Sequence, residues 1–147
     1  MTRAVLSDPA PHRASTGFAA LLLAVVGGFQ AALAAGAPWG EAAYGGAHRG
    51  VLPARYRASS AVSTLVYAAL LAVTLGRGPG TLARRRILTA ASGLMMVGTV
   101  MNLASRSRVE RVVWTPVAGT LAITLLRVAR GSRTRRSGPW ASARLLP

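Results

Sequence analysis

The sequence predicts an all-α protein, a bundle of four transmembrane helices with both termini in the cytoplasm. Of its 147 residues, 52% are hydrophobic and only 14% are charged. The charged residues divide the chain into long uncharged stretches, and arginines and aromatic residues gather near the ends of these stretches. Spanning helices need about 20 apolar residues flanked by such anchors, so the pattern indicates a multi-pass membrane protein.

The first span is predicted at residues 18–37, because no charge occurs between Arg13 and Glu41. A cleaved secretory signal is an alternative interpretation, in which the tripeptide 32–34 (Ala-Leu-Ala) or 35–37 (Ala-Gly-Ala) supplies the cleavage site. The apolar stretch exceeds the roughly 7–15 residues usual for such signals, which favours a retained span.

The second and third spans are predicted at residues 58–75 and 87–103, each within an uncharged stretch of 19 residues. Proline is tolerated in the first turn of a helix, so Pro53 indicates where the second helix begins. After the Gly- and Pro-rich breaker at residues 76–80, Thr81 is expected to cap the third helix.

The fourth span is predicted at residues 112–127, where only 15 uncharged residues separate the flanking arginines. Those arginines can snorkel toward the interface and lengthen the span. Ser107 and Glu110 fit a capping box that opens this helix. Pro116 is expected to kink the helix or to loosen its outer end, because proline cannot donate a backbone hydrogen bond.

The distribution of arginines predicts the orientation, since cytoplasmic segments carry the excess of positive charge. All 18 basic residues are arginines. Twelve share the side of the termini: Arg3, Arg13, Arg77, Arg84, Arg85, Arg86, Arg127, Arg130, Arg133, Arg135, Arg136 and Arg144. Six lie on the other side: Arg49, Arg55, Arg57, Arg106, Arg108 and Arg111. We therefore expect both termini in the cytoplasm and the protein in the plasma membrane.

The segment between the first two spans, residues 38–57, is rich in glycine and polar residues. Trp39 and Tyr44 are expected to anchor it in the outer leaflet as one or two helical turns, which Gly45 and Gly46 would end. A lid or binding loop is the alternative interpretation of the same segment.

Helices in lipid associate through small residues and interhelical hydrogen bonds. Two ladders with i, i+4 spacing are therefore candidates for a helix–helix contact between the first two spans. They are Ala20, Ala24 and Gly28 on the first helix, and Ser60, Thr64, Ala68 and Ala72 on the second.

Several classes of chemistry are excluded or disfavoured. Without cysteine, neither disulfide exchange nor thiolate catalysis is possible. The three acidic residues, Asp8, Glu41 and Glu110, lie outside the predicted spans, which argues against proton-coupled export through an embedded carboxylate. No nucleophile–base pair, metal-ligand spacing or phosphate-cradling loop is recognisable, so we expect neither an enzyme nor a bound cofactor or metal. The arginines flank apolar stretches, which argues against nucleic-acid binding.

A polar outer vestibule is the one candidate site. Gln30 and Asn102 are polar residues in the outer halves of their predicted helices, and charged residues flank them. The predicted vestibule comprises Gln30, Glu41, Arg55, Arg57, Asn102, Arg106, Arg108 and Glu110. Since arginine suits phosphate recognition, an anionic headgroup or a phosphate-bearing molecule is the expected ligand. Alternatively, these residues serve only helix packing and capping.

Three segments are expected. Residues 1–16 form a cytoplasmic N-terminal segment, residues 17–130 the membrane domain, and residues 131–147 a basic tail. Arginines near a membrane surface are attracted to anionic lipids, so we expect the tail to lie on the cytoplasmic leaflet. A docking site for a soluble partner is the alternative role of the tail.

The stretches 38–53, with Pro-Trp-Gly and Tyr-Gly-Gly, and 101–116, MNLASRSRVERVVWTP, resemble small uncharacterised four-helix membrane proteins of high-GC actinobacteria. The resemblance covers roughly residues 17–130. It implies a class of protein and no activity.

Together these features predict a non-enzymatic accessory or structural protein of the membrane that works through helix–helix contacts with itself or another membrane protein. The alternative is a small carrier or binder of lipid or of an anionic small molecule, which would use the arginine-rich vestibule.

Overall fold

The computed structural model describes residues 10–131, with side chains described from Arg13 onward. Within these residues the chain is all-helical, as predicted. Its elements are α1 (Ala10–Ala35), η1 (Gly40–Ala42), η2 (Tyr44–Gly46), α2 (Ala54–Thr74), α3 (Thr81–Leu103), η3 (Glu110–Trp114) and α4 (Thr115–Gly131). Most of the expected N-terminal segment and basic tail lies outside the described residues.

Four helical stretches are long and apolar enough to cross a membrane: Arg13–Ala35, Ala54–Thr74, Thr81–Leu103 and Glu110–Gly131. The first starts before the predicted position, because the helix continues through residues that the charge pattern had assigned to an N-terminal segment. The fourth is longer than predicted, because η3 and α4 form one continuous helical rod of 22 residues.

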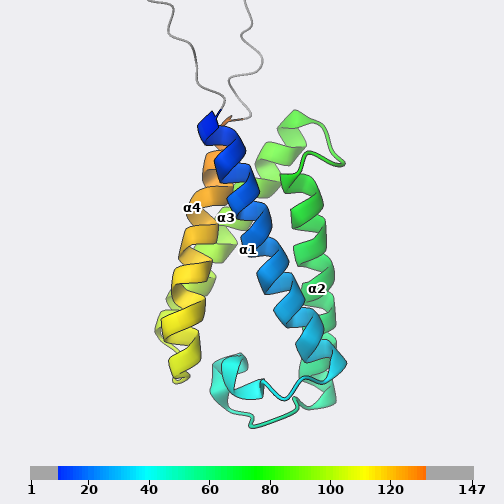
Figure 1. The fold of residues 1–147 in the computed structure, drawn as a ribbon, viewed down its shortest axis with the longest axis vertical. Coiled ribbons are helices and arrows are strands. Elements are labelled where there is room, and N and C mark those ends of the chain that lie inside the picture. Colours follow the sequence, from blue (N-terminus) through cyan, green and yellow to red (C-terminus); the bar gives the residue numbers. More distant parts are fainter. Residues whose placement is uncertain (1–9, 132–147) are drawn as a thin grey trace, which may run out of the picture.

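The four helices run alternately up and down (Figure 1). The start of α1, the end of α4 and the α2–α3 connection lie at one end, here called the terminal end. Loop 1, residues 36–53, and the α3–η3 connection lie at the opposite end, here called the loop-1 end. α1 packs along α2, α3 packs along α4, and α1 also contacts α4, whereas α2 and α3 contact each other much less.

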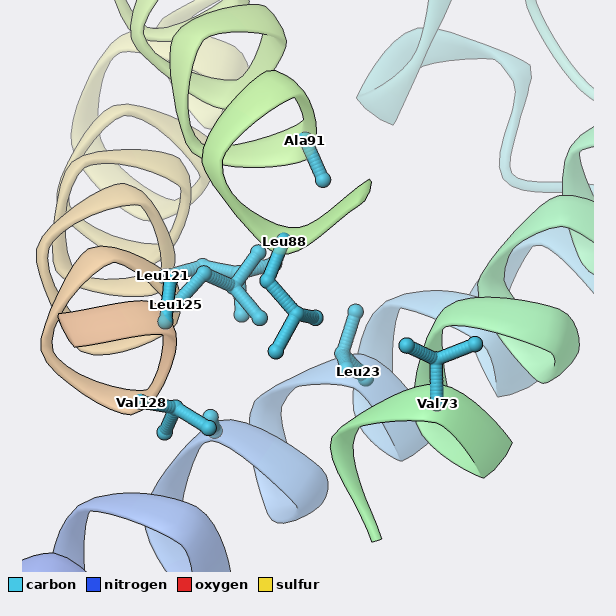
Figure 2. Close-up of a cluster of buried hydrophobic side chains, with 9 residues drawn as sticks. Leu23, Val73, Leu88, Ala91, Leu121, Leu125 and Val128 are labelled. Atoms are coloured by element: carbon cyan, nitrogen blue, oxygen red, sulfur yellow. The ribbon is translucent and has the colours of Figure 1, made fainter. Parts of the chain in front are cut away.

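The larger of two hydrophobic core clusters occupies the half of the bundle near the terminal end, and a smaller cluster of Leu33, Ala43 and Leu52 lies at the loop-1 end. Leu23, Leu88, Leu121 and Leu125 are each at most 1% exposed. Figure 2 shows these side chains pointing toward one another from α1, α3 and α4, with Val73 approaching from α2. Close packing of this kind replaces lipid contacts by protein contacts of similar strength, so shape complementarity holds the helices together.

The outer surface of the bundle is strongly apolar. Large side chains such as Leu65 (71% exposed), Met101 (68%) and Val112 (73%) lie on it. Soluble monomeric proteins rarely expose contiguous apolar surface on this scale, whereas a membrane-spanning bundle presents such side chains to the acyl chains.

α1 and α2 pack against each other as predicted, but through different residues. Ala24, Gly28 and Ala68 of the predicted ladders are exposed, and only Ser60 is fully buried. The two helices approach each other closely at Gly27, where a Cβ atom would lie 3.3 Å from Cβ of Tyr67. The ladder prediction is therefore wrong for these three residues.

The helix ends were predicted with mixed success. Pro53 precedes the first residue of α2, as expected, whereas α3 begins at Thr81 itself, and its N-cap residue Gly80 makes no side-chain capping bond. The loosening expected near Pro116 takes the form of the π-helical turn η3, in which the Thr115 N–H donates to the Glu110 carbonyl. This wider turn lies directly before the proline, whose ring would clash in a regular helix.

A candidate cavity at the loop-1 end

Loop 1 turns sharply through three consecutive residues with positive φ, Tyr44 (52°), Gly45 (78°) and Gly46 (72°). Glycine adopts this left-handed conformation without strain. Gly46 also approaches the α3–η3 connection closely, because a Cβ atom there would lie 2.9 Å from Cβ of Ser107. A larger residue at position 46 would therefore push loop 1 away from the bundle.

Three hydrogen bonds fasten loop 1 to the start of the fourth helical rod. The Ser107 hydroxyl donates to the Glu41 carbonyl at 2.8 Å, and the Trp114 indole N–H donates to the Ala42 carbonyl at 2.9 Å. The Gly45 N–H donates to Oε1 of Glu110 at 2.9 Å. Loop 1 is thus bound to η3 rather than lying free on the lipid surface.

A fourth contact fastens loop 1 to α2. The Tyr44 hydroxyl donates to the Tyr56 carbonyl at 3.2 Å and shares a hydrogen bond of 2.9 Å with the Ser60 hydroxyl. The expected role of Tyr44 as a lipid anchor is therefore wrong, because its hydroxyl points into the protein. Trp39 does lie at the surface, 50% exposed, with its ring stacked on Phe29.

Beneath loop 1, the four helices surround a cavity of about 240 Å³. Every helix contributes to its wall, and so do loop 1 and η3. The lining residues are Val26, Phe29, Gln30, Ala42, Ala43, Tyr44, Tyr67, Met95, Gly98, Asn102, Glu110, Trp114, Val117, Ala118 and Leu121. The lining combines apolar and aromatic side chains with a few polar groups, which is the usual character of a ligand pocket.

The structure brings three of the predicted vestibule residues together. Gln30 from α1, Asn102 from α3 and Glu110 from η3 all line this cavity. Oε1 of Gln30 is buried and has no hydrogen-bond partner among the described residues. Such an orphaned acceptor is costly in a low-dielectric interior, so a donor from a ligand or from water would stabilise it.

The other five predicted residues do not reach the cavity. Glu41 is exposed and pairs with Arg49 at 3.4 Å, and Arg55 lies over the ring of Tyr56. Arg57 donates to the Ala34 carbonyl at 3.1 Å, near the end of α1. Arg106 and Arg108 are exposed. An arginine-rich vestibule is therefore not formed by these residues.

Glu110 changes the interpretation of the site. It is the first residue of the apolar helical stretch Glu110–Gly131 and is only 7% exposed, so this acidic residue is buried at the edge of the stretch. The predicted capping box is half formed. The Glu110 N–H donates to the Ser107 hydroxyl at 3.4 Å, while the Glu110 carboxylate turns toward Gly45 instead of the Ser107 N–H.

Several lining residues were not predicted. Tyr67 lies in the middle of α2, and its hydroxyl points toward the sulfur of Met95 at 4.0 Å. A tyrosine at the centre of an apolar span, away from either interface, was the available signal. Trp114 lies near the end of the fourth predicted span, and its ring packs against Phe29 with the ring centroids 4.5 Å apart. A tryptophan near a helix end can face lipid or the bundle interior, and no sequence pattern distinguishes the two orientations.

Within residues 10–131, no group of three or more His, Cys, Asp or Glu residues lies close enough to hold a metal ion. The chemistry of the cavity therefore rests on hydrogen bonds, on the single carboxylate and on the aromatic rings.

Fold and site together define a class: a small four-helix protein, whose helices are long and apolar enough to span a membrane, with a largely apolar cavity that carries a few polar groups near one end of the bundle. No family model, curated protein or solved structure matches the chain. The resemblance to actinobacterial membrane proteins accordingly stays a prediction.

Proposed function

We propose that the protein is a non-enzymatic, multi-pass membrane protein that binds a small molecule in the cavity beneath loop 1. The observation that carries this proposal is the convergence of Gln30, Asn102 and Glu110 on one cavity at the loop-1 end. A structural bundle would gain stability by filling this space with apolar side chains, because unfilled volume and orphaned polar groups both cost free energy.

The cavity is small enough to limit the ligand. An engineered cavity of about 150 Å³ binds benzene. A volume of about 240 Å³ therefore takes a molecule, or the end of a longer one, that is somewhat larger than benzene. Binding without chemistry is favoured because the lining residues include one carboxylate but no Ser, Thr, Cys, His or Lys side chain that could act with it as a nucleophile or base.

The experiment compares two Gly→Leu variants of α3. Gly98 lines the cavity and Gly93 is exposed on the outer surface, and a Cβ atom at either position meets nothing within 4 Å. Wild-type protein, Gly98→Leu and Gly93→Leu would be purified from native membrane in lipid nanodiscs, and retained molecules identified by mass spectrometry. We expect the wild type and Gly93→Leu to retain a small molecule that Gly98→Leu loses. Equal retention by all three, or no retained molecule, would refute the binding function.

A second candidate function is the accessory role predicted from the sequence. The outward face of α1 favours it, since Ala24, Gly28, Ala31 and Ala35 are all exposed there. Small side chains let a partner helix approach the backbone closely. The exposed small residues of the predicted ladder on α1 would therefore contact a partner helix and not α2.

Neighbouring glycines separate the two packing faces of α1. A Cβ atom at Gly28 meets nothing within 4 Å, whereas one at Gly27 meets Tyr67. Gly28→Leu should therefore leave the bundle intact and displace a partner helix, and Gly27→Leu should disturb α1–α2 packing. Co-purification of a stoichiometric second protein with the wild type but not with Gly28→Leu would support the accessory role. A lone chain in both preparations would contradict it.

The proposed location is the plasma membrane, with Ala10 and Gly131 on the cytoplasmic side. The excess of arginines on the side of the termini supports this orientation. The chain has no cysteine, so single cysteines report topology cleanly. Ala47→Cys in loop 1 should react with an impermeant thiol reagent added outside the cell, and Ser137→Cys should not. The opposite labelling pattern would invert the orientation.

A further inference from the structure

We infer that the cavity recognises a primary ammonium group, with Glu110 as its counter-charge. This inference rests on the proposed binding function and specifies its ligand class. It replaces the anionic ligand expected from the sequence, because no arginine lines the cavity.

Glu110 is a buried carboxylate without a cationic partner among the described residues. Its side chain is almost entirely buried, and its carboxylate accepts one hydrogen bond, from the Gly45 N–H. Among the described residues, Glu41 forms an ion pair with Arg49. Three arginines lie within four sequence positions of Glu110, but none of them pairs with it. Buried charges in proteins are normally paired, so a cationic ligand would supply the missing partner.

The balance of donors and acceptors in the cavity also favours a cation. Gln30 and Glu110 both line the cavity, and Oε1 of Gln30 is buried without a hydrogen-bond partner among the described residues. The Tyr44 hydroxyl is already engaged by the Tyr56 carbonyl and by Ser60. The site thus offers acceptors to a ligand, and a primary ammonium carries three donors and a positive charge.

The aromatic lining of the cavity favours a cation as well. Phe29, Tyr44, Tyr67 and Trp114 all contribute to the wall. The faces of aromatic rings attract cations, most strongly where water is excluded. A carboxylate among several rings is therefore suited to an ammonium group with a short apolar chain. Such a group occurs both in free alkylamines and in the headgroup of phosphatidylethanolamine.

The methionines of α3 allow the binding site to be observed directly. Met95 lines the cavity, whereas Met96 (48% exposed) and Met101 (68%) lie on the outer surface. With ¹³C-methyl methionine, binding in the cavity shifts the Met95 signal, while partition into the bilayer shifts the other two. The protein would be placed in phosphatidylglycerol nanodiscs, which contain no ammonium group.

The probes are n-butylammonium and its uncharged counterpart n-butanol. We expect n-butylammonium to shift the Met95 signal saturably and n-butanol to bind at least about tenfold more weakly, a difference of about 1.4 kcal/mol. Equal affinity for the two probes would overturn the ammonium assignment while leaving a cavity that binds. If neither probe shifts Met95, the ammonium assignment is wrong, and the retention experiment with Gly98→Leu decides separately whether the cavity binds anything.

Two matched carboxylate variants test the role of Glu110. Glu110→Gln removes the charge but keeps an oxygen that accepts from the Gly45 N–H, so loop 1 should stay in place. Glu41→Gln removes the same charge from the exposed Glu41–Arg49 pair. We expect n-butylammonium affinity to fall at least about tenfold in Glu110→Gln and to be unchanged in Glu41→Gln. Equal affinity in both variants and the wild type would refute the counter-charge role.

Two further arms complete the design. Gln30→Met keeps the length of the side chain but removes the orphaned acceptor, so it should weaken n-butylammonium binding without affecting loop 1. Adding phosphatidylethanolamine to the nanodiscs distinguishes the two sources of the ligand. If this lipid shifts the Met95 signal and competes with n-butylammonium, the natural ligand is the lipid headgroup. If it does neither, a free amine is the ligand class.

Discussion

At the terminal end of the bundle, Leu23, Leu88 and Leu125 fill the space between the helices and are at most 1% exposed. At the loop-1 end, the same helices surround a cavity of about 240 Å³ lined by Gln30 and Glu110 among others. The terminal end is thus filled by the larger core cluster, whereas the loop-1 end combines a smaller cluster of Leu33, Ala43 and Leu52 with hydrogen bonds from loop 1. The densest packing and the proposed binding site therefore lie in different halves of the bundle.

The division has a physical reason. In a membrane, helices gain little from burying apolar surface, so the bundle must be stabilised wherever side chains interlock best. Concentrating that packing at the terminal end allows the loop-1 end to retain a polar cavity. Loop 1 then contributes hydrogen bonds to η3 that stabilise the less densely packed end.

The largest predicted effect tests the packed half. Leu125→Ala removes a fully buried side chain and should lower the free energy of unfolding by about 2–5 kcal/mol. Leu65→Ala makes the same change at a position on the outer surface that is 71% exposed, and should cost about 0.5 kcal/mol or less. Reversible denaturation in mixed micelles measures both. Equal losses would mean that the terminal end is not the more stable half.

The second prediction concerns the attachment of loop 1. Trp114→Phe keeps a ring against Phe29 but removes the indole donor to the Ala42 carbonyl, which should cost about 1 kcal/mol. The loss should be local, so amide hydrogen exchange should quicken in residues 40–46 and stay unchanged in the half of α4 near Gly131.

Trp39→Phe is the matched control for that experiment. Trp39 also stacks on Phe29, but its ring is at the surface. We expect this change to leave exchange in loop 1 near the wild-type rate. Faster exchange throughout the bundle in Trp114→Phe would show instead that the two halves unfold as one unit.

The sequence was sufficient to predict the helices, because hydrophobicity and charge are local properties of each stretch. It also predicted that Gln30, Asn102 and Glu110 lie at the same end of the bundle, because the chain direction alternates between successive spans. It did not predict which helix faces meet. Alanine and glycine occur on every face of α1, and the choice of Gly27 over Gly28 depends on the position of Tyr67, which is distant in the sequence.

The arginines could not be placed from the sequence for a different reason. Their side chains are long, and backbone carbonyls at helix ends compete for them. Arg84 donates to the carbonyls of Val73 and Thr74, both at 2.8 Å, near the end of α2, and Arg57 serves the end of α1 in the same way. Charge counting assigned these residues to a membrane side, but their local role is to cap a neighbouring helix.

The smallest predicted effect tests whether the packed half depends on polar contacts at all. The buried Ser92 hydroxyl donates to the Ala122 carbonyl at 2.7 Å and so links α3 to α4. Interhelical hydrogen bonds in membrane proteins contribute about 0.6 kcal/mol on average, so Ser92→Ala should lower the free energy of unfolding by about that amount. Thr64→Val removes a hydroxyl that donates to the Ser60 carbonyl within its own helix at 2.9 Å, and should have no measurable effect. A loss in Ser92→Ala as large as that in Leu125→Ala would show that a polar contact, and not shape complementarity, holds the terminal end together, and the contrast between the two halves would then disappear.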